Sequence, residues 1–397
     1  MPSDRSSDRS PLPSTDRLPS RVRAVVLYGG RSAEHDISRV SAANVVAALD
    51  PARYEIHQVA ITRDGQWLLA DGVTAIERDG DSLGGLPVVG TPTSASQLAR
   101  LGAPRRRTDD ARPSAEASEG TVVVPAAGEG DEIPTVVIPV LHGPNGEDGT
   151  VQGLLELAGV AYVGAGVLGS AVSMDKAMSK ALLDAAGIPQ VRWRAGRAQR
   201  IDEALLDEIL DDLGPTVFVK PANMGSSVGV GRATTPTELR DAVFEAARYD
   251  EMLVFEEGVV ARELEIGVLG NDDPVCSVPG EVIAAGEFYD YRDKYVDGRA
   301  RTVVPADLDA EQVETMERLA LRTFVTLRAE GLARVDMFYE SDGRGFLVNE
   351  VNTLPGFTPS SMFPMMFAAS GLGYSGLVDE MVRLALERHA RRSRFLR

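Results

Sequence analysis

Oxygen-bearing side chains near the end of the chain have the composition and spacing of a cation site. Asp336, Glu350 and Asn352 flank a turn of small polar residues at 341–345, and the apolar residues around them indicate the two strands of a hairpin. Carboxylate and amide oxygens suit a hard divalent ion such as Mg²⁺, which normally arrives with phosphate groups. The alternative is that these acids are simply solvated, as most surface carboxylates are. The apolar neighbours and the Asn-Thr-Leu-Pro-Gly segment at 352–356 favour the metal site.

Strand geometry places these groups on two facing surfaces. Side chains alternate along a strand, so Asp336 shares a face with Arg334, and Glu350 shares a face with Val348 and Asn352.

The expected register brings two like charges together. If Glu340 and Phe346 close the turn, Asp336 lies opposite Glu350. Like charges set across a strand pair destabilise it unless a cation lies between them. The hairpin therefore predicts bound metal.

A second segment has the features of a phosphate site. Lys220 ends a predicted strand at 216–220, and a Gly/Ser loop follows at 225–231. Backbone N–H groups of small residues can converge on phosphate oxygens, and Lys220 would add a point charge. The glycines have neither the spacing of the P-loop nor that of the dinucleotide-binding motif, so neither of these phosphate-binding motifs supports this interpretation. A plain hairpin turn is the alternative.

Further candidates lie at the ends of predicted strands. His142 follows the apolar run 135–141, where open α/β sheets bind ligands, and Glu34 occupies the corresponding place after the first strand. A strand-end histidine is more often structural than catalytic, so this assignment stays open. Tyr295, beside Lys294 in an irregular aromatic stretch, is a candidate for a mobile cover over a site.

Two lysines stand four residues apart on the predicted helix 173–186. Its apolar stripe is formed by Met174, Ala177, Met178 and Ala181, and the lysines lie on the other face. We therefore expect Lys180 to be solvated.

Composition limits the classes of function. The chain has 397 residues, 44% of them hydrophobic and 25% charged, which is typical of a globular protein of two or three domains. No apolar run reaches the roughly 20 residues that span a bilayer, and no secretory signal is present. A net charge of −18 argues against nucleic-acid binding, and we expect the basic run 391–394 to be a solvated helix end. The single cysteine, Cys276, indicates a small buried side chain in a reducing, cytoplasmic protein.

The pattern of elements predicts an α/β (α+β) protein of three units. Residues 1–20 form a disordered leader, 21–168 an open α/β domain with an insertion at about 71–130, 169–255 a central domain and 256–397 a last domain. The segments 67–69 and 121–124 could be the ordered edges of this insertion. The predicted elements are strands at 22–28, 53–62, 135–141, 216–220, 252–256 and 264–269, with helices at 38–49, 173–186, 236–248, from 309 and after 375.

Taken together, these segments resemble the D-alanine–D-alanine ligases of the ATP-grasp superfamily. Two long signatures carry the resemblance, HGPNGEDGTVQG at 142–153 and the segment GLARVDMF through NEVNTLPG at 331–356. The similarity runs in order from about 22 to 385 and leaves out the leader and the insertion. Shorter matches lie at 29–38, 173–180, 219–229 and 287–295.

The resemblance implies a fold, an activity and partners. The fold would have three domains with ATP held between the central and last ones, usually in a homodimer. The activity would join two D-alanine molecules, with ATP hydrolysed to ADP and phosphate through an acyl phosphate, for peptidoglycan precursors. Two Mg²⁺ ions would be the cofactors, with Mn²⁺ able to replace them. Nucleic acid and membrane are not expected partners.

The resemblance also assigns roles by position. The metal ligands would be Asp336, Glu350 and Asn352. The ATP-binding residues would be Lys176, Lys220, Ser227, Glu256, Glu257, Val259, Glu263 and Lys294. The substrate-binding residues would be Glu34, His142, Arg334, Gly356 and Ser361. The catalytic group would be Glu34, Ser226, Tyr295, Arg334 and Gly356, with Tyr295 directed towards Glu34 and Ser226 in the closed state.

Three rival functions are left open. One of them, another ATP-grasp carboxylate–amine ligase, is disfavoured by the two long signatures. A D-alanine–D-lactate ligase is the nearest, but relatives of that type typically replace the tyrosine that corresponds to Tyr295. A nucleotide-binding protein without turnover is the third, and the intact set of charged residues argues against it.

Overall fold

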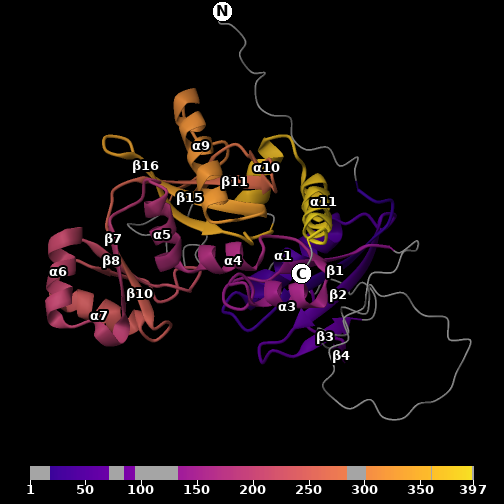
Figure 1. Ribbon diagram of the computed structural model, residues 1–397, viewed down its shortest axis with the longest axis horizontal. Coiled ribbons are helices and arrows are strands. Elements are labelled where there is room, and N and C mark those ends of the chain that lie inside the picture. Colours follow the sequence, from indigo (N-terminus) through magenta and orange to yellow (C-terminus); the bar gives the residue numbers. More distant parts are fainter. Residues whose placement is uncertain (1–17, 71–84, 94–132, 284–300, 359, 396–397) are drawn as a thin grey trace, which may run out of the picture.

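The computed structural model describes residues 18–70, 85–93, 133–283, 301–358 and 360–395, and these form three sheets with helices packed against them (Figure 1). Most of the predicted leader, the segment 121–124 and the segment around Lys294 and Tyr295 lie outside the described residues.

The first sheet is mostly parallel and has β1 at its centre. Its strand order is β4-β3-β2-β1-β5-β6, with β1 parallel to both β2 and β5. Because the chain passes from β1 to β2 on one side and later returns to β5 on the other, the carboxyl ends of β1 and β5 form a switch point. Its elements are β1 (Val22–Gly29), α1 (His35–Ala48), β2 (Tyr54–Ile61), β3 (Trp67–Ala70), β4 (Thr91–Thr93), β5 (Thr135–Val140), α3 (Thr150–Ala158) and β6 (Ala161–Tyr162).

Part of the predicted insertion belongs to this sheet. Leu86 is buried, its carbonyl accepts a hydrogen bond from Arg39 Nε at 2.7 Å, and the carbonyl of Pro87 accepts one from Tyr28 Oη at 2.7 Å. Strand β4 then pairs with β3. The prediction that 71–130 is largely a surface extension is therefore wrong for 85–93.

The second sheet is antiparallel, with strand order β7-β10-β8-β9. The predicted helix start at Thr235 is confirmed, because Thr235 Oγ1 accepts from the backbone N–H of Glu238 at 3.2 Å and Pro236 occupies the first turn. The elements are β7 (Trp193–Arg197), α6 (Glu203–Leu213), β8 (Val217–Pro221), β9 (Gly231–Ala233), α7 (Pro236–Ala246) and β10 (Met252–Glu257).

The third sheet carries the hairpin and has the order β14-β13-β11-β15-β16, with β12 paired to β11. Side chains of α9 share a core cluster with one face of β11 and β15, and α10 packs beside Gly267 on the other face. The elements are β11 (Arg262–Gly270), β12 (Val275–Cys276), β13 (Gly280–Ile283), β14 (Arg301–Val303), α9 (Ala310–Thr326), β15 (Gly331–Glu340), β16 (Gly345–Asn352) and α10 (Met362–Ala369).

The hairpin register differs from the expected one near the turn. Glu340 pairs with Gly345 rather than Phe346, yet Asp336 still lies opposite Glu350, because the register shifts beside Asp336. Such a bulge reverses which face the following residues take.

The bulge changes the environment of Val348. Val348 is buried in the core cluster with Phe346 and Val351, so it does not share the face of Glu350. Phe346, Val348 and Val351 are spaced by two and then three positions, so all three side chains can face the same core only if the strand contains one extra residue.

The connection into the second sheet is a broken helix. Asp175 separates α4 (Val167–Met174) from α5 (Lys176–Ala185) and caps α5 by accepting from Met178 N at 2.9 Å. The predicted continuous helix 173–186 and its apolar stripe are therefore wrong, since Met178 is 52% exposed. The buried side chains of α5 are Ser179, Lys180 and Leu183.

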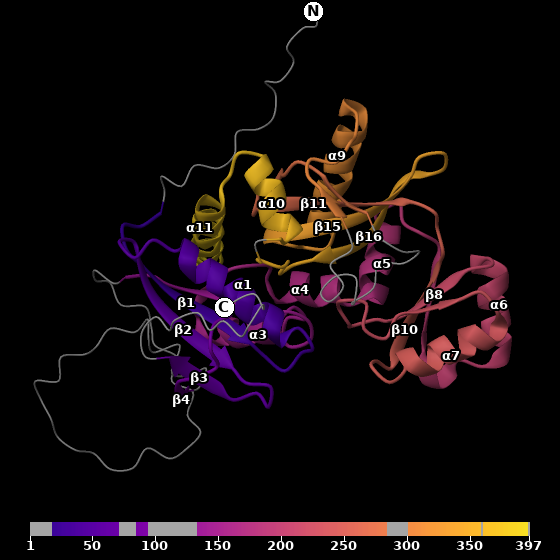
Figure 2. The same cartoon turned by 180° about the vertical axis from the view of Figure 1, so that it is seen from behind.

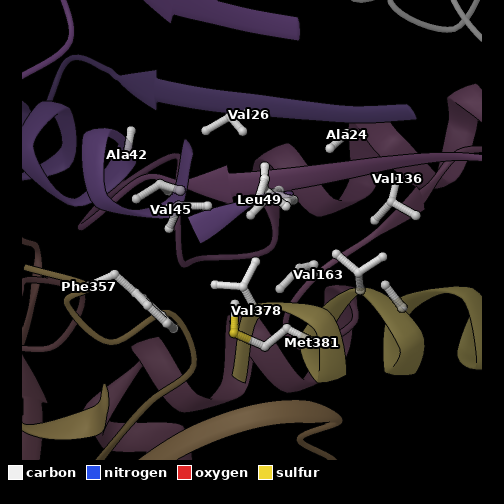
Figure 3. Close-up of a cluster of buried hydrophobic side chains, with 14 of the residues drawn as sticks. Ala24, Val26, Ala42, Val45, Leu49, Val136, Val163, Phe357, Val378 and Met381 are labelled. Atoms are coloured by element: carbon white, nitrogen blue, oxygen red, sulfur yellow. The ribbon is translucent and has the colours of Figure 1, made fainter. Parts of the chain in front are cut away.

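The last helix, α11 (Tyr374–Arg392), returns to the first sheet (Figures 1 and 2). Val378 and Met381 join the cluster that contains Val26 (Figure 3). Asp379 accepts hydrogen bonds from Tyr54 Oη at 2.6 Å and from Arg53 at 2.8 Å. Helix α11, near the end of the sequence, thus completes the hydrophobic core of the first sheet.

The basic helix end is not simply solvated, contrary to expectation. Arg391 forms ion pairs with Asp272 and Glu330, and Arg392 pairs with Glu156 at 2.5 Å.

The single cysteine, Cys276, is half-buried rather than fully buried as predicted.

Among the described residues, no helix combines the length and the apolar character needed to cross a membrane.

Candidate active site

A cleft of about 590 Å³ lies between the second and third sheets. Strands β8, β10 and β11 and the connection at 258–261 supply most of its wall. The aromatic side chains of Phe218 and Phe338 lie beside charged groups, a combination that suits a flat base joined to an anionic chain. The predicted ATP residues that line it are Lys220, Glu256, Glu257, Val259 and Glu263.

Glu256 is buried between two lysines at this cleft. Its carboxylate forms ion pairs with Lys220 Nζ at 2.5 Å and with Lys180 Nζ at 2.9 Å. Burial alone would raise the pKa of Glu256, but the two ammonium groups lower it to about 2. Burial opposes the charge of Lys220 as well, yet Glu256 raises the pKa of Lys220. Lys180 is 2% exposed, so the expectation that it is solvated is wrong.

Glu257 lines the cleft, but its carboxylate is occupied. It accepts from Arg192 N and Arg192 Nε, both at 2.8 Å, and from Arg344 at 2.5 Å. A nucleotide in the cleft would therefore meet the main chain at this position.

The Gly/Ser loop approaches the hairpin through Lys176. Lys176 Nζ donates to the carbonyl of Met224 at 2.7 Å and lies 3.7 Å from Glu350 Oε2. Ser226 and Ser227 have φ values of 51° and 57°, in the left-handed region where residues with a Cβ are strained. The loop is thus held in a conformation that its own residue types do not prefer.

The hairpin face holds a network centred on Asp336. Arg334 donates to both carboxylate oxygens of Asp336 at 2.7 Å and pairs with Glu265 at 3.0 Å. Asn352 Nδ2 donates to Asp336 Oδ2 at 2.9 Å. Burial opposes the Arg334 charge, but these carboxylates raise the pKa of Arg334 well above its usual value.

The donor set of this face fits Mg²⁺. Asp336 and Glu350 are register partners, and Asn352 is bonded to Asp336, so two carboxylates and one amide converge. In the part of the chain that the structure describes, no cluster of three or more Asp, Glu, His or Cys side chains could enclose a metal ion. Mg²⁺ commonly uses one or two carboxylates and completes its shell with water and substrate phosphates, so an open set of this kind suits it.

Glu34 lies where the first sheet meets the Gly/Ser loop. Ser226 Oγ donates to Glu34 Oε1 at 2.5 Å. A Cβ on Gly143 would stand 3.2 Å from Glu34 Oε2, and the φ of Gly143 is +72°, so this close approach favours glycine.

His142 and Glu147 surround the same carboxylate. His142 is buried and its Nδ1 is bonded to the carbonyl of Leu354 at 3.1 Å, while Nε2 finds no partner among the described residues. Burial lowers the pKa of His142. Glu147 accepts from Gly143 N at 2.6 Å, and burial, with the charge of Glu34 adding to it, raises the pKa of Glu147 to about 8.

Gly356 and Ser361 adjoin one another after the hairpin. A Cβ on Gly356 would approach Ser361 Oγ to 2.8 Å. Ser361 Oγ is also bonded to Thr358, accepting from its backbone N–H at 3.0 Å and lying 2.8 Å from its hydroxyl.

Comparisons with known proteins identify the architecture. Residues 23–165 match the family model described as the D-ala D-ala ligase N-terminus, and 182–383 match the D-ala D-ala ligase C-terminus. The chain belongs to the D-alanine–D-alanine ligase family. The chain is 45% identical over 380 residues to a D-alanine–D-alanine ligase from Listeria welshimeri, with 93% of this chain and 97% of that protein covered.

Solved structures agree with this placement. The D-alanine–D-alanine ligase of Coxiella burnetii aligns with a TM-score of 0.72 at 33% identity, covering 94% of this chain and 97% of that one. The VanG D-Ala:D-Ser ligase of Enterococcus faecalis aligns with a TM-score of 0.72 at 31% identity, covering 92% and 99%. The predicted ATP-grasp fold and membership of this family of ATP-using enzymes are thereby confirmed.

Sequence reasoning missed three charged residues of this family member. Glu265 pairs with Arg334, Glu147 adjoins Glu34, and Lys180 pairs with Glu256. Glu265 could have been found by strand alternation, because it shares a face with Glu263. Lys180 had a compositional signal, since the chain has only four lysines against 37 arginines.

Proposed function

We propose that this chain joins two molecules of D-alanine into D-alanyl-D-alanine, with conversion of ATP to ADP and phosphate, for peptidoglycan precursors in the cytoplasm. The observation that supports it most is that the groups proposed to bind anion, metal and ammonium lie close to one another. Lys176 links the Gly/Ser loop to Glu350, and Ser226 links the same loop to Glu34. Nucleotide, metal and amino acid would therefore be neighbours.

The nucleotide would occupy the 590 Å³ cleft. Lys220 and Lys176 would contact the phosphates, with Ser227 contributing from the loop. Glu256, Glu257, Val259 and Glu263 would hold the base and ribose. Lys294, in the proposed cover, lies outside the described residues and stays a prediction.

Asp336, Glu350 and Asn352 would hold two Mg²⁺ ions, or Mn²⁺ in their place. When bound, the ions would neutralise phosphate charge, which is the main requirement of phosphoryl transfer. Arg334, fixed by Asp336 and Glu265, would stay charged and oriented at the same face.

The first step would form an acyl phosphate. A carboxylate oxygen of the first D-alanine attacks the γ-phosphorus, and the bond to the bridging oxygen breaks, releasing ADP. Glu34 would anchor the ammonium group of this substrate, with Ser226 and His142 at its side. Ser226 is bonded to Glu34 and His142 is held by the carbonyl of Leu354, and these contacts would keep the attacking carboxylate in line.

The second step would form the peptide bond. The amine of the second D-alanine, once deprotonated, attacks the acyl carbon, and phosphate leaves. Arg334 and the backbone N–H of Gly356 would stabilise the oxyanion, and Ser361 would meet the carboxylate of the second substrate. Tyr295 would close over the site; it lies outside the described residues and remains a prediction.

Assembly and domain limits are part of the proposal. We assign the domains as 21–168, 169–255 and 256–397 and expect a homodimer, by analogy with the family. Helix α11 packs on the first sheet, so the last unit would not fold independently of the first.

The test is an ADP-release assay with D-alanine, L-alanine, D-serine and D-lactate as second substrates, with product masses determined. We expect D-alanine-dependent release and a D-alanyl-D-alanine product. Preferential formation of D-alanyl-D-serine would instead support the function of the VanG relative, and nucleotide binding without release would refute ligase activity.

A further inference from the structure

The buried group of Lys180, Glu256 and Lys220 contains two lysines and one carboxylate. Burial lowers the pKa of Lys180, and the charge of Glu256 opposes this effect. Lys180 reaches Glu256 from helix α5, and Lys220 reaches it from the neighbouring strand β8. The exposed fractions of the three side chains are 2%, 3% and 14%. Lys220 is the most accessible of the three, and Lys220 and Glu256 both line the nucleotide cleft.

Each lysine binds a different oxygen of the carboxylate. Lys180 Nζ meets Oε1 at 2.9 Å, and Lys220 Nζ meets Oε2 at 2.5 Å. Lys180 therefore does not compete with Lys220 for the same atom. If Lys180 were missing, Lys220 would be the sole cation within 4 Å of the Glu256 carboxylate in the described part of the chain. Glu256 would then neutralise the charge of Lys220.

Composition gives an independent reason to regard Lys180 as selected for its chemistry. Of four lysines in the chain, Lys176, Lys220 and Lys294 fall in segments already assigned to nucleotide binding, and Lys180 is the fourth. Elsewhere the chain uses 37 arginines as its cations. A compact ammonium on a flexible stem differs from the planar guanidinium, so the presence of a lysine rather than an arginine at this buried position is informative.

We propose that Lys180 is a positioning residue that neutralises Glu256, so that the charge of Lys220 remains available to the phosphates of the nucleotide. This inference rests on the proposed ATP site. It assigns Lys180 no contact with the nucleotide. Its effect is electrostatic and should depend on the sum of charges in the group.

The charge sum can be set with two substitutions. The wild type carries +1, Lys180→Met carries 0, Glu256→Gln carries +2, and the double variant carries +1 again. Glutamine keeps an oxygen acceptor at the cleft. Removing one charge several ångströms from a phosphate should weaken ADP binding by roughly tenfold to a hundredfold.

The experiment measures ADP and adenosine binding to all four proteins by calorimetry at one Mg²⁺ concentration. We expect Lys180→Met to weaken ADP binding, and the double variant to regain it to within about threefold of the wild type, within the usual scatter of non-additivity. Adenosine has no phosphate, so its affinity should change little in Lys180→Met. The two variants that carry Glu256→Gln also alter the proposed base contact, so the ADP affinity of each is compared with its own adenosine affinity. Met178→Leu, on the exposed face of the same helix, is the matched control and should bind as the wild type does.

Three results would overturn the inference. Lys180→Met could bind ADP normally, the double variant could remain as weak as Lys180→Met, or adenosine affinity could fall in parallel with ADP affinity. If Lys180→Met does not fold, Glu256→Gln and the double variant make the same comparison, one charge apart. A wild type that binds neither ADP nor adenosine would instead refute the proposed function itself.

Discussion

Asp336 is a proposed metal ligand and accepts hydrogen bonds from both Arg334 and Asn352, so Asp336→Asn can separate the metal role from the structural one. The substitution keeps the shape of the side chain and removes one negative charge. In the wild type, both oxygens accept from Arg334 at 2.7 Å, and Oδ2 also accepts from Asn352 at 2.9 Å. The variant keeps one oxygen and replaces the other by an amide nitrogen, which cannot ligate a cation.

The expected effects on stability and activity differ in size. Arg334 retains Glu265 at 3.0 Å, so it is not left as an unpaired buried charge. Loss of one charged hydrogen bond should lower the free energy of unfolding by about 1–3 kcal/mol. Changes around a metal ligand typically cost tenfold to a hundredfold in affinity or activity, and loss of a direct ligand should cost at least about a hundredfold in turnover.

The assay follows phosphate release at saturating ATP and D-alanine across a Mg²⁺ titration, with thermal unfolding measured in parallel. We expect the half-saturating Mg²⁺ concentration to rise and the turnover to fall. Asp342→Asn is the control, because Asp342 is exposed on the turn of the same hairpin. A variant with reduced stability but unchanged Mg²⁺ dependence would refute the metal assignment and leave Asp336 with only a structural role beside Arg334.

Three further perturbations test other parts of the site. Ser226→Ala removes the 2.5 Å hydrogen bond to Glu34 and should raise the KM for D-alanine about tenfold, with a smaller rise in the KM for ATP because Ser226 also holds the loop; an unchanged KM for D-alanine would contradict the pairing. Gly356→Ala would place a methyl group 2.8 Å from Ser361 Oγ and should lower both thermal stability and turnover, the latter by roughly tenfold to a hundredfold; adding Ser361→Ala should partly recover the stability, and no recovery would exclude the steric cause. The pKa of Glu147, about 8 when folded against a usual 4.5, means that the folded protein holds an extra proton between these values, so wild-type stability should fall as pH rises through this window by at most about 1.4 kcal/mol per pH unit. Glu147→Gln should lessen this fall in denaturant unfolding at about pH 5 and about pH 8, and parallel curves would contradict the shift.

The hairpin shows how far local pattern can determine a site. The predicted pairing of Asp336 with Glu350 is confirmed, because the register shift beside Asp336 offsets the different closure of the turn. Alternation misplaced Val348 and the turn, because a strand pattern assumes a constant period of two. The bulge is dictated by the core behind the sheet, where Phe346 and Val351 must both be buried, and that core is built largely by α9.

Lys180 shows a different limit of sequence reasoning. Helical periodicity assigned it to the solvent because it lies away from Met174 and Met178, but the buried side chains of α5 are Ser179, Lys180 and Leu183, two of which are polar. A buried lysine is tolerated only with a partner, and that partner, Glu256, is 76 positions later in the sequence, in strand β10. Spacing within one helix cannot reveal such a pair, whereas the rarity of lysine in this chain does point to it.

The arrangement of contacts between the sheets explains why the site must be assembled by the whole chain. The second sheet reaches the third through Lys176, which bonds Met224 and lies near Glu350, and reaches the first through Ser226 and Glu34. The first link ends on Met224, just before the loop that contains the strained Ser226 and Ser227, and the second begins at Ser226 itself. Because a strained conformation persists only when its surroundings hold it, these two polar links and the loop conformation should depend on one another. Loss of either link should therefore relax the loop and disturb phosphate and D-alanine binding together, whereas changes within a single sheet should affect one ligand at a time.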